Sequence, residues 1–494
     1  MKRIFMLALI LASVLLVSMA ALSGCGNRNN IEGLEYYLLS DGTYGVMAVK
    51  AKDIADIVIP ATYKGKPVTQ IMPQAFQFSR IKTATIPDTV TRIGAYAFSD
   101  CIDLSAITIP DSVTSIGECA FSRCFNLNSV TISDSVVSIG AWVFYGCVGL
   151  TSITIPNSVE SITEWAFSGC TGLTSVTIPD SVTNIGKDAF SGCKGLTSIT
   201  IPDSVTSIGE RAFSSCIGLT SITISDSVTS IGERAFSSCI GLTSITISDS
   251  VTDISEWAFN GCAGLTSVKI PNSVTSISNY AFYDCAGLTS IEIPDSVTNI
   301  GDRAFYGCPI ETATIPALAV HYINNSRLKT VTITSGESIG ESAFSGCKGL
   351  TSITIPDSVT SIGENAFKGC QIEMATIPAL AVNHIKNSRL KVVTITSGES
   401  IGWSAFSGYT GLTSITIPNS VTSIDGYAFS GCTGLTSITI PDSVTNIGVY
   451  AFSGCTGLTS IKFQGTKAQW EAIEWVFWID VHCTVYCTDG NITI

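Results

Sequence analysis

LTSITISDSVTSIGERAFSSCIG, from Leu219 to Gly241, decides the fold, because its pattern returns about every 23 residues along most of the 494-residue chain. Self-similarity at this period is typical of a solenoid, in which each unit buries its apolar face only by stacking on its neighbours. In the half LTSITI, Leu219, Ile222 and Ile224 form the apolar face of a short strand whose other face bears hydroxyl groups. The half DSVTSIGERAF spaces its apolar residues irregularly around a glycine, which favours a winding return segment over a full helix.

The motif IPDSVTSIGExAFxxC, followed by GLTSI, resembles the BspA-type leucine-rich repeats of bacterial surface proteins, and the resemblance covers roughly residues 54–463. The many copies in register make it specific. It implies an α/β solenoid, a right-handed horseshoe of coils of about 23 residues with a parallel sheet on the concave side, irregular return segments and a cap at each end. It further implies a role in adhesion or binding, without catalytic residues.

Composition narrows the classes of partner. The net charge is −13, with 26 Lys and Arg against 39 Asp and Glu, and no basic stripe is visible, which argues against a nucleic-acid partner. Outside the N-terminus no run of 18 apolar residues exists, so no membrane-spanning helix is expected there. A continuous repeat also overrides the usual relation between length and domain number, and we expect one elongated domain.

The N-terminus reads as an export signal. MKRIFMLALILASVLLVSMAALSGC combines two basic residues with an apolar run and small residues, which predicts a signal peptide over residues 1–24. LSGC, ending at Cys25, also resembles a bacterial lipobox, which implies cleavage before Cys25 and acylation of that residue. An uncleaved membrane anchor is the alternative, because the apolar length permits it. Either form would attach the chain to the bacterial membrane, and cell-surface exposure is the expectation.

Residues 25–53 are predicted to hold the lipidated Cys25, a short polar tether and an N-terminal cap. EYYLLSDGTYGVMAVK alternates apolar and polar residues around Asp41 and Gly42, which is the signal for a hairpin. A solenoid end exposes unpaired backbone and core side chains, so a polar-faced cover is needed.

The repeats are predicted over residues 54–463. Counting from Ile54 to Leu458 gives nineteen strand copies, and cysteines fall every 23 residues from Cys101 to Cys308. Two shorter coils interrupt the period at about residues 310–327 and 372–389, and their Ala- and Leu-rich sequences favour a helical turn. Each shorter coil belongs to one of two similar 62-residue blocks, which look like a tandem duplication.

Residues 464–494 depart from the repeat and are rich in aromatic residues. The segment resembles the closing part of BspA-type arrays, in which a short helix and strand cover the last coil. We therefore expect a C-terminal cap, with a separate binding element as the alternative.

The cysteine column suggests a disulfide ladder at first, since an exported protein could hold one. Stacked coils, however, keep the β-carbons of equivalent residues nearly 4.8 Å apart, beyond the disulfide mean. Free, buried thiols are the prediction, and Tyr409 at one column position fits a packing role. Cys483 and Cys487, near His482, could pack in the cap, form a disulfide or, least favoured, bind a metal.

No residue pattern indicates an enzyme. The three histidines, His321, His384 and His482, lack repeated Ser, Cys or carboxylate neighbours and are expected at the surface. No phosphate loop or dinucleotide motif is present, so no catalytic residue, metal or cofactor is predicted.

Two surface rows could carry binding. A strand position holds Thr in fifteen coils, which is explained by β-propensity and solubility or by binding of glycan or ordered water. Lys269 and Glu292 interrupt this row on adjacent strands, where they should pair. The position before Ala-Phe varies and gathers large side chains in neighbouring coils, which points to binding anchors or to packing on the outer turn. The candidate binding residues in this row are Trp142, Trp165, Trp257, Tyr280, Arg211 and Arg234.

Three functions follow from these observations. The first is a lipid-anchored surface protein that mediates adhesion, or binds an extracellular protein or glycan, by multivalent contact. The second is a structural envelope or spacer protein without a specific ligand. The weakest is a Thr-ladder binder of glycan or ice.

Overall fold

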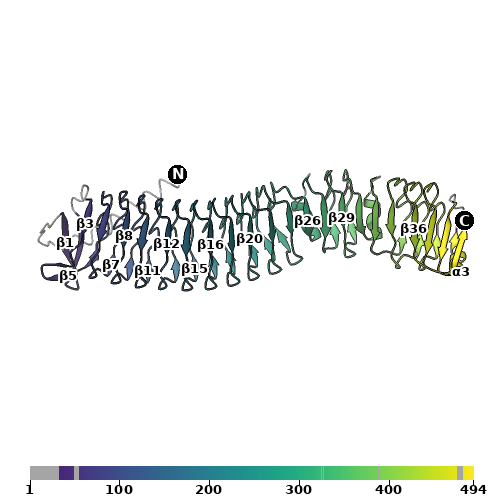
Figure 1. The fold of residues 1–494 in the computed structure, drawn as a ribbon. Coiled ribbons are helices and arrows are strands. Elements are labelled where there is room, and N and C mark those ends of the chain that lie inside the picture. The colour runs from purple at the N-terminus through teal and green to yellow at the C-terminus, as the bar shows by residue number, and fades with distance from the viewer. Residues whose placement is uncertain are drawn as a thin grey trace. The chain divides into compact units, whose positions relative to one another are not determined.

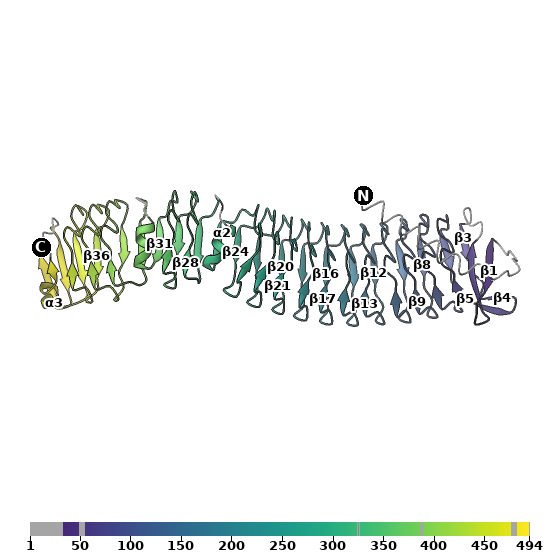
Figure 2. The same ribbon diagram turned by 180° about the vertical axis from the view of Figure 1, so that it is seen from behind.

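The computed structural model describes residues 33–48, 55–323, 325, 327–385, 389–475 and 482–493. It divides into two compact units, Met1–Leu196 and Thr197–Ile494, and each is built from stacked coils whose strands pair in parallel (Figures 1 and 2). The predicted signal peptide, Cys25 and the tether lie outside the described residues. Within the described ranges, no helix is both long enough and apolar enough to cross a membrane.

The strand of the repeat motif forms the first ladder of each unit. In unit 1 these strands are β3 (Asp56–Val58), β6 (Thr83–Thr85), β8 (Ala106–Thr108), β10 (Ser129–Thr131), β12 (Ser152–Thr154) and β14 (Ser175–Thr177). In unit 2 they are β16 (Ser198–Thr200), β18 (Ser221–Thr223), β20 (Ser244–Thr246), β22 (Ser267–Lys269), β24 (Ser290–Glu292), β26 (Thr312–Ile315), β27 (Thr330–Ile333), β29 (Ser352–Thr354), β31 (Met374–Ile377), β32 (Val392–Ile395), β34 (Ser414–Thr416), β36 (Ser437–Ile440) and β38 (Ser460–Phe463). The described residues thus contain the nineteen repeat strands that the sequence predicts.

The two faces of these strands differ as the alternation predicts. Leu219, Ile222 and Ile224 are buried, whereas Ser221 and Thr223 on β18 are exposed. Equivalent residues lie opposite each other in consecutive coils, so that Ile222 pairs with Ile245 of β20. Stacking therefore places apolar residues of one coil against apolar residues of the next, as where Ile291 lies opposite Ala313.

The return segments contain short strands that the sequence analysis did not predict. Residues of the SVTSI half form a second parallel ladder, in most coils only two residues wide. In unit 1 its strands are β5 (Lys66–Ile71), β7 (Arg92–Ile93), β9 (Ser115–Ile116), β11 (Ser138–Ile139), β13 (Ser161–Ile162) and β15 (Asn184–Ile185). In unit 2 they are β17 (Ser207–Ile208), β19 (Ser230–Ile231), β21 (Asp253–Ile254), β23 (Ser276–Ile277), β25 (Asn299–Ile300), β28 (Ser338–Ile339), β30 (Ser361–Ile362), β33 (Ser400–Ile401), β35 (Ser423–Ile424), β37 (Asn446–Ile447) and β39 (Glu474–Trp475).

A third set of hydrogen bonds links the turns around the Ala-Phe pair, which is Val143-Phe144 in the coil of Trp142. In one coil the backbone N–H groups of Trp142, Phe144 and Gly146 donate to carbonyls of the next coil at 3.0, 2.9 and 2.8 Å. Trp142 and Gly146 have left-handed backbones, with φ of 62° and 70°, whereas Phe144 between them does not. The left-handed residues let alternate N–H groups point toward the next coil and satisfy backbone donors that a turn would otherwise leave unpaired.

The two shorter coils return through helical turns, as predicted. The first contains η2 (Ala317–Ala319) and α2 (Val320–Ile323), and the second contains η3 (Ala379–His384). Each begins after a proline, Pro316 or Pro378, which occupies the N-cap position in an extended conformation. In the described residues, helix is otherwise confined to α3 (Lys467–Glu471).

Each unit has additional strands at its outer sequence end. At the N-terminal end, β1 (Leu34–Leu38) and β2 (Tyr44–Ala48) form an antiparallel hairpin around Asp41 and Gly42, which confirms that prediction. β2 then pairs with β5 of the second ladder, and β4 (Thr62–Tyr63) also pairs with β5.

At the C-terminal end, β40 (Thr484–Cys487) extends the first ladder from β38, and β41 (Gly490–Thr493) pairs antiparallel to β40. The helix α3 begins at a capping box of Thr466 and Gln469, and its buried Trp470 packs against Phe463 with ring centroids 5.2 Å apart.

Candidate functional site

The cysteine column lies inside the coils and forms no disulfides. Cys101 to Cys308 in the column are buried and free, as are Cys347, Cys370, Cys432 and Cys455, which confirms the prediction. The thiol of Cys239 donates to the carbonyl oxygen of Phe213 in the preceding coil at 3.1 Å, and other column thiols repeat this contact. Burial raises the pKa of Cys170 and Cys239 to about 12, so these thiols are neutral and unreactive at physiological pH.

Tyr409 fills the column position after the second shorter coil. It is buried, and its hydroxyl donates to the backbone carbonyl of Ile385 at 2.9 Å. The larger side chain reaches a carbonyl of the shortened coil. This contact supports the packing role that the sequence predicts.

Cys483 lies just before β40 and Cys487 is its last residue. Neither forms a disulfide, and Cys483 is buried. Packing in the cap therefore describes Cys483, while Cys487 is half-buried. His482, His321 and His384 are exposed, as expected. Across the described residues, no group of three or more His, Cys, Asp and Glu side chains is arranged to hold a metal ion.

The hydroxyl face of the first ladder is exposed and regular. Ser221 and Thr223 lie opposite Ser244 and Thr246 of the next coil, and most coils repeat this pairing. Lys269 lies directly opposite Glu292, in the register that the sequence predicts for this pair.

In unit 1, Trp142 and Trp165 stack face to face. Their ring centroids are 4.6 Å apart with an interplanar angle of 9°, and Tyr145 meets Trp142 edge-on at 5.0 Å. The indole N–H of Trp165 donates to Glu164 at 2.8 Å. Both tryptophans are half-buried, so part of each ring remains accessible to solvent.

Unit 2 holds a second stack, made of Trp257 and Tyr280. Their centroids are 4.1 Å apart at 4°, and the Arg234 guanidinium lies 5.3 Å from the centroid of Trp257. Arg234 also pairs with its neighbour Glu233. Arg211 occupies the preceding coil and lies 3.6 Å from Glu210.

The structure thus brings the predicted residues together in two separate groups. In each group one large face of an aromatic ring is covered by its neighbour, which supports the packing interpretation for those faces. The ring edges and the arginines remain partly exposed. A binding partner at these two groups would therefore contact the edges of the aromatic rings and the arginine side chains.

A third aromatic group, which the sequence did not predict, has rings that are not stacked flat. Trp403 is 61% exposed and lies 5.4 Å from Tyr427 at 56°, and Tyr427 lies 5.3 Å from Tyr450 at 36°. The ring of Trp403 lies over Gly426, where an added β-carbon would come within 2.5 Å of it. Trp403 stands where the first 62-residue block has Glu341, so comparing the two blocks could have revealed it.

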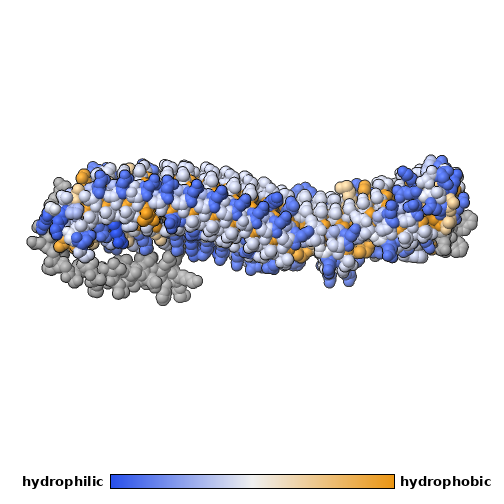
Figure 3. Space-filling model, turned by 90° about the horizontal axis from the view of Figure 1, so that it is seen from below, coloured by the Kyte–Doolittle hydropathy of each residue, from blue (hydrophilic) through white to orange (hydrophobic). Residues whose placement is uncertain are grey.

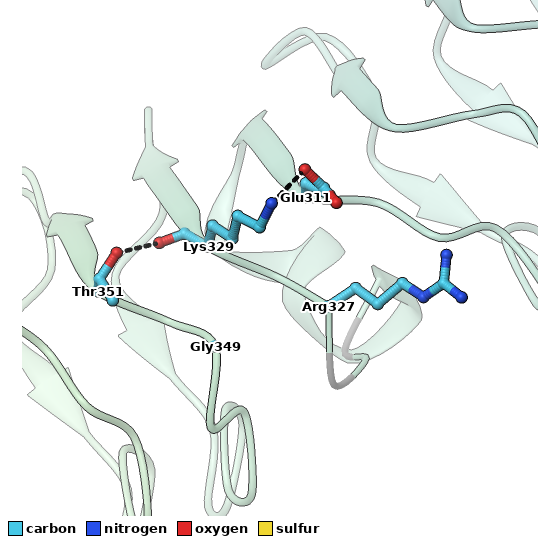
Figure 4. A pocket seen from close by; sticks show the side chains of 5 residues that line it. All are labelled: Glu311, Arg327, Lys329, Gly349 and Thr351. Carbon is cyan, nitrogen blue, oxygen red and sulfur yellow. Dashed lines mark hydrogen bonds and ion pairs between the residues drawn. The ribbon is translucent and has the colours of Figure 1, made fainter.

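A hollow beside the first shorter coil was also missed. It has a volume of about 440 Å³ and is lined by Glu311, Arg327, Lys329, Gly349 and Thr351 (Figure 4). The signal was the repeated NSRLK sequence, which places an Arg and a Lys in both shorter coils. Elsewhere, the face drawn in Figure 3 is mainly polar, with hydrophobic residues in small groups.

Comparison with known proteins places the repeats in a family. The family model described as the BspA type leucine rich repeat region matches residues 69–197, 138–265, 252–327, 321–397 and 383–474. No curated protein matches the chain.

Several solved structures are similar. A leucine-rich repeat protein from Bacteroides ovatus is 27% identical, with 91% of this chain and 100% of that chain covered and a TM-score of 0.47. A leucine rich cell surface protein from Faecalibacterium prausnitzii is 28% identical, with 92% and 100% covered and a TM-score of 0.40. The pneumococcal vaccine antigen PcpA is 16% identical, with 81% and 93% covered and a TM-score of 0.37. Since the family model matches most of the chain, from residue 69 to residue 474, this protein belongs to the BspA-type leucine-rich repeat family.

Proposed function

We propose that this chain is an exported, lipid-anchored protein of the bacterial surface that binds an extracellular protein or glycan through several coils at once. The observation that carries the proposal is the contrast between constant and variable positions. The buried Phe and Cys columns hardly change, whereas the position before Ala-Phe changes from coil to coil and gathers Trp, Tyr and Arg. Aromatic and Arg side chains are enriched among the anchors of binding surfaces.

A binding screen tests this proposal. The soluble form beginning at Gly26 would be applied to extracellular matrix proteins and to a panel of glycans, with saturable binding as the expected result. Replacing Trp142, Trp165, Trp257 and Tyr280 by Ser should weaken binding, whereas Thr177→Ala, Thr200→Ala and Thr223→Ala together should not. A uniform Thr row would present the same chemistry at each coil and could not discriminate partners.

A spacer without a specific ligand is the second candidate function. The observation in its favour is the flat stacking of Trp142 on Trp165 and of Trp257 on Tyr280, which uses ring faces within the protein. This alternative predicts that the aromatic variant loses stability and that no ligand in the screen binds saturably.

Membrane attachment is tested separately. The change Cys25→Ala should abolish labelling by radioactive palmitate and shift the protein from the detergent phase to the aqueous phase, because attached acyl chains provide the membrane affinity. Unchanged labelling in this variant would contradict the assignment of Cys25 as the lipidated residue.

A further inference from the structure

The first shorter coil leaves a polar hollow at the edge of the first ladder. The strands β24, β26, β27 and β29 pair in register there, although the strand positions Ile310 and Leu328 are only 18 residues apart. The hollow is lined by Glu311, Arg327, Lys329, Gly349 and Thr351, without aromatic or aliphatic side chains (Figure 4). It is open to solvent, since Arg327 and Lys329 are exposed.

Lys329 and Glu311 are paired with each other, and among the described residues the third charged group of the hollow, Arg327, has no charged partner. Lys329 Nζ lies 2.7 Å from Glu311 Oε2, and the hydroxyl of Thr351 donates to the Lys329 carbonyl at 3.4 Å. The Arg327 side chain extends away from this pair in Figure 4, and within the described part of the chain nothing accepts a hydrogen bond from its guanidinium. The backbone N–H of Arg327 donates to Asn325 Oδ1 at 2.8 Å.

The second shorter coil supplies an internal comparison. Lys391 lies 2.8 Å from Glu373, which repeats the Lys329–Glu311 pair. Its arginine, Arg389, instead donates to Gln371 Oε1 at 2.5 Å. The residue equivalent to Gln371 in the first block is Pro309, which has no side-chain acceptor. The two blocks thus differ in one residue that matters here. Gln371 accepts a hydrogen bond from Arg389, whereas Pro309 offers no side-chain acceptor to Arg327.

The chemistry of the free group indicates its ligand. A guanidinium presents a planar fork of donors that fits a carboxylate or sulfate group and binds it with charge-assisted hydrogen bonds. The Glu311 carboxylate is balanced by Lys329, so it opposes an incoming anion less than a lone acid would. Lys348, next to Gly349, adds another exposed cation in the first block, whereas Thr410 stands there in the second.

We propose that this hollow binds an anionic group, carboxylate or sulfate, of an acidic polysaccharide, and that Arg327 is the binding side chain. A polysaccharide is favoured over an acidic peptide because the lining offers charges and a hydroxyl but nothing to take up apolar side chains. The exposed and half-exposed hydroxyls of Thr312 and Thr330 on the adjacent strands β26 and β27 could hold neighbouring sugar units. The inference rests on the proposed role in binding extracellular ligands and names one site and one ligand class.

The test measures binding of the soluble chain from Gly26 to polygalacturonate, dextran sulfate, poly-glutamate and neutral dextran. Polygalacturonate and dextran sulfate distinguish a carboxylate from a sulfate ligand, and binding to one or both, weakened by salt, is expected. The change Arg327→Gln should raise the Kd about tenfold or more, as expected for loss of a charge-assisted contact. Arg389→Gln is the matched control and should leave the Kd within about twofold, because Arg389 is already held.

Two further variants exchange the features of the blocks. Pro309→Gln introduces the acceptor that holds the second arginine and should weaken binding without removing a charge. Gln371→Ala removes this acceptor from Arg389 and should increase the number of bound polysaccharide groups per chain. Unchanged melting temperatures would show that these effects are local.

Binding of an acidic polysaccharide with equal affinity to wild type and Arg327→Gln would overturn the inference while leaving the proposed function standing. Failure of both acidic polysaccharides to bind would also overturn it, and binding to matrix proteins would still support the proposed function. Binding of poly-glutamate with the same dependence on Arg327 would identify an acidic peptide as the partner and contradict the polysaccharide assignment.

Discussion

Left-handed residues precede the Ala-Phe pair, or Val143-Phe144 in the coil of Trp142, in coil after coil. Trp142, Trp257 and Ser342 adopt φ of 62°, 59° and 55°, in a region where a residue with a β-carbon is disfavoured by about 1 to 2 kcal/mol. Two residues after the Phe, the second left-handed position is most often Gly, as at Gly146 and Gly346. Side chains are thus retained at the first position despite the backbone cost, which fits positions that stack with neighbouring coils or contact a partner.

Because a positive φ is strained for a residue with a β-carbon, glycine should stabilise the protein at left-handed positions whose side chain makes few contacts. The change Ser342→Gly should raise the free energy of unfolding by roughly 0.5 to 1 kcal/mol, because glycine adopts a positive φ without a steric penalty. Chemical denaturation would measure the change. Ser345→Gly in the same turn is the control and should destabilise, since Ser345 is not left-handed. Destabilisation by both changes would argue against strain at position 342.

The buried thiols predict a loss of stability at alkaline pH. Burial raises the pKa of Cys239 to about 12 from its ordinary value of 9.0. Between these values the unfolded chain loses a proton that the folded chain keeps, so each pH unit lowers the free energy of unfolding by up to about 1.4 kcal/mol per such thiol. This stabilising contribution is complete below pH 9 and is lost as the pH rises toward 12.

The measurement is urea unfolding in reductant between pH 7 and 10.5, for wild type and Cys239→Ala. The variant should start less stable but lose stability less steeply above pH 9. Parallel pH profiles for the two proteins would show that Cys239 ionises equally in both states.

For single residues, the sequence predicts burial of the side chain better than it predicts the backbone conformation. The 23-residue spacing of Cys239 and Cys262 was enough to predict buried, free thiols, because equivalent residues of stacked coils share one environment. The left-handed backbone at Trp142 could not be predicted, since Trp has no preference for that region. Hydrogen bonds to the next coil impose it.

In each shorter coil a glycine lies close to an alanine, and both 62-residue blocks contain this contact. Gly336 has φ of 107°, and a β-carbon there would come within 2.8 Å of the β-carbon of Ala317 in η2. Gly398 and Ala379 repeat this contact in the second block, at 2.6 Å. Small residues at both positions let the helical turn lie close to the following segment.

An aspartate links the coils on either side of the shorter coil. Asp295 Oδ1 accepts hydrogen bonds from the hydroxyls of Thr334 and Ser335, both at 2.6 Å. Asp295→Ala should lower the free energy of unfolding by about 1.5 to 2 kcal/mol. This is the lower part of the range for hydrogen bonds to a charged group, because Asp295 is exposed. Thermal and chemical denaturation would measure the change.

Asp249→Ala is the matched control for Asp295→Ala. Asp249 is exposed in a coil of standard length and should tolerate the change within about 0.5 kcal/mol. Equal effects of the two substitutions would contradict the bridging role of Asp295.

The elements of the fold were predicted to different degrees. Ala and Leu in the shorter coils predicted helical turns because their intrinsic preference is strong. Strands such as β19 were not predicted, since two residues are too few to show an alternating pattern. Nor could the sequence show that Gln371 holds Arg389 while Pro309 leaves Arg327 free, because this depends on how the 18-residue coil places side chains.

In each unit, apolar columns connect one coil to the next. In unit 2 the rings of Phe213, Phe236 and Phe259 stack with centroids 5.5 Å apart and nearly parallel planes. Each ring contacts its neighbours in adjacent coils, so stability is approximately a sum of coil and nearest-neighbour contributions. The surface positions are therefore free to vary without loss of the fold.

Counting repeats predicted the nineteen first-ladder strands of the described chain, because each coil adds one strand to that ladder. Which surface residues face each other was only partly predictable. The spacing placed Trp257 and Tyr280 in neighbouring coils, but not with their ring faces 4.1 Å apart. That contact depends on side-chain rotamers, which the pattern does not specify.

Hydrogen exchange of Phe236→Ala most directly tests the central claim, that stacked coils are stabilised chiefly by their immediate neighbours. Emptying this buried position should cost about 3 to 5 kcal/mol. We predict faster amide exchange in the coil of Phe236 and in those of Phe213 and Phe259, with unchanged protection in the coils around Phe429 and Phe452. Equal loss of protection from the first coil of unit 2 to the last would contradict the account.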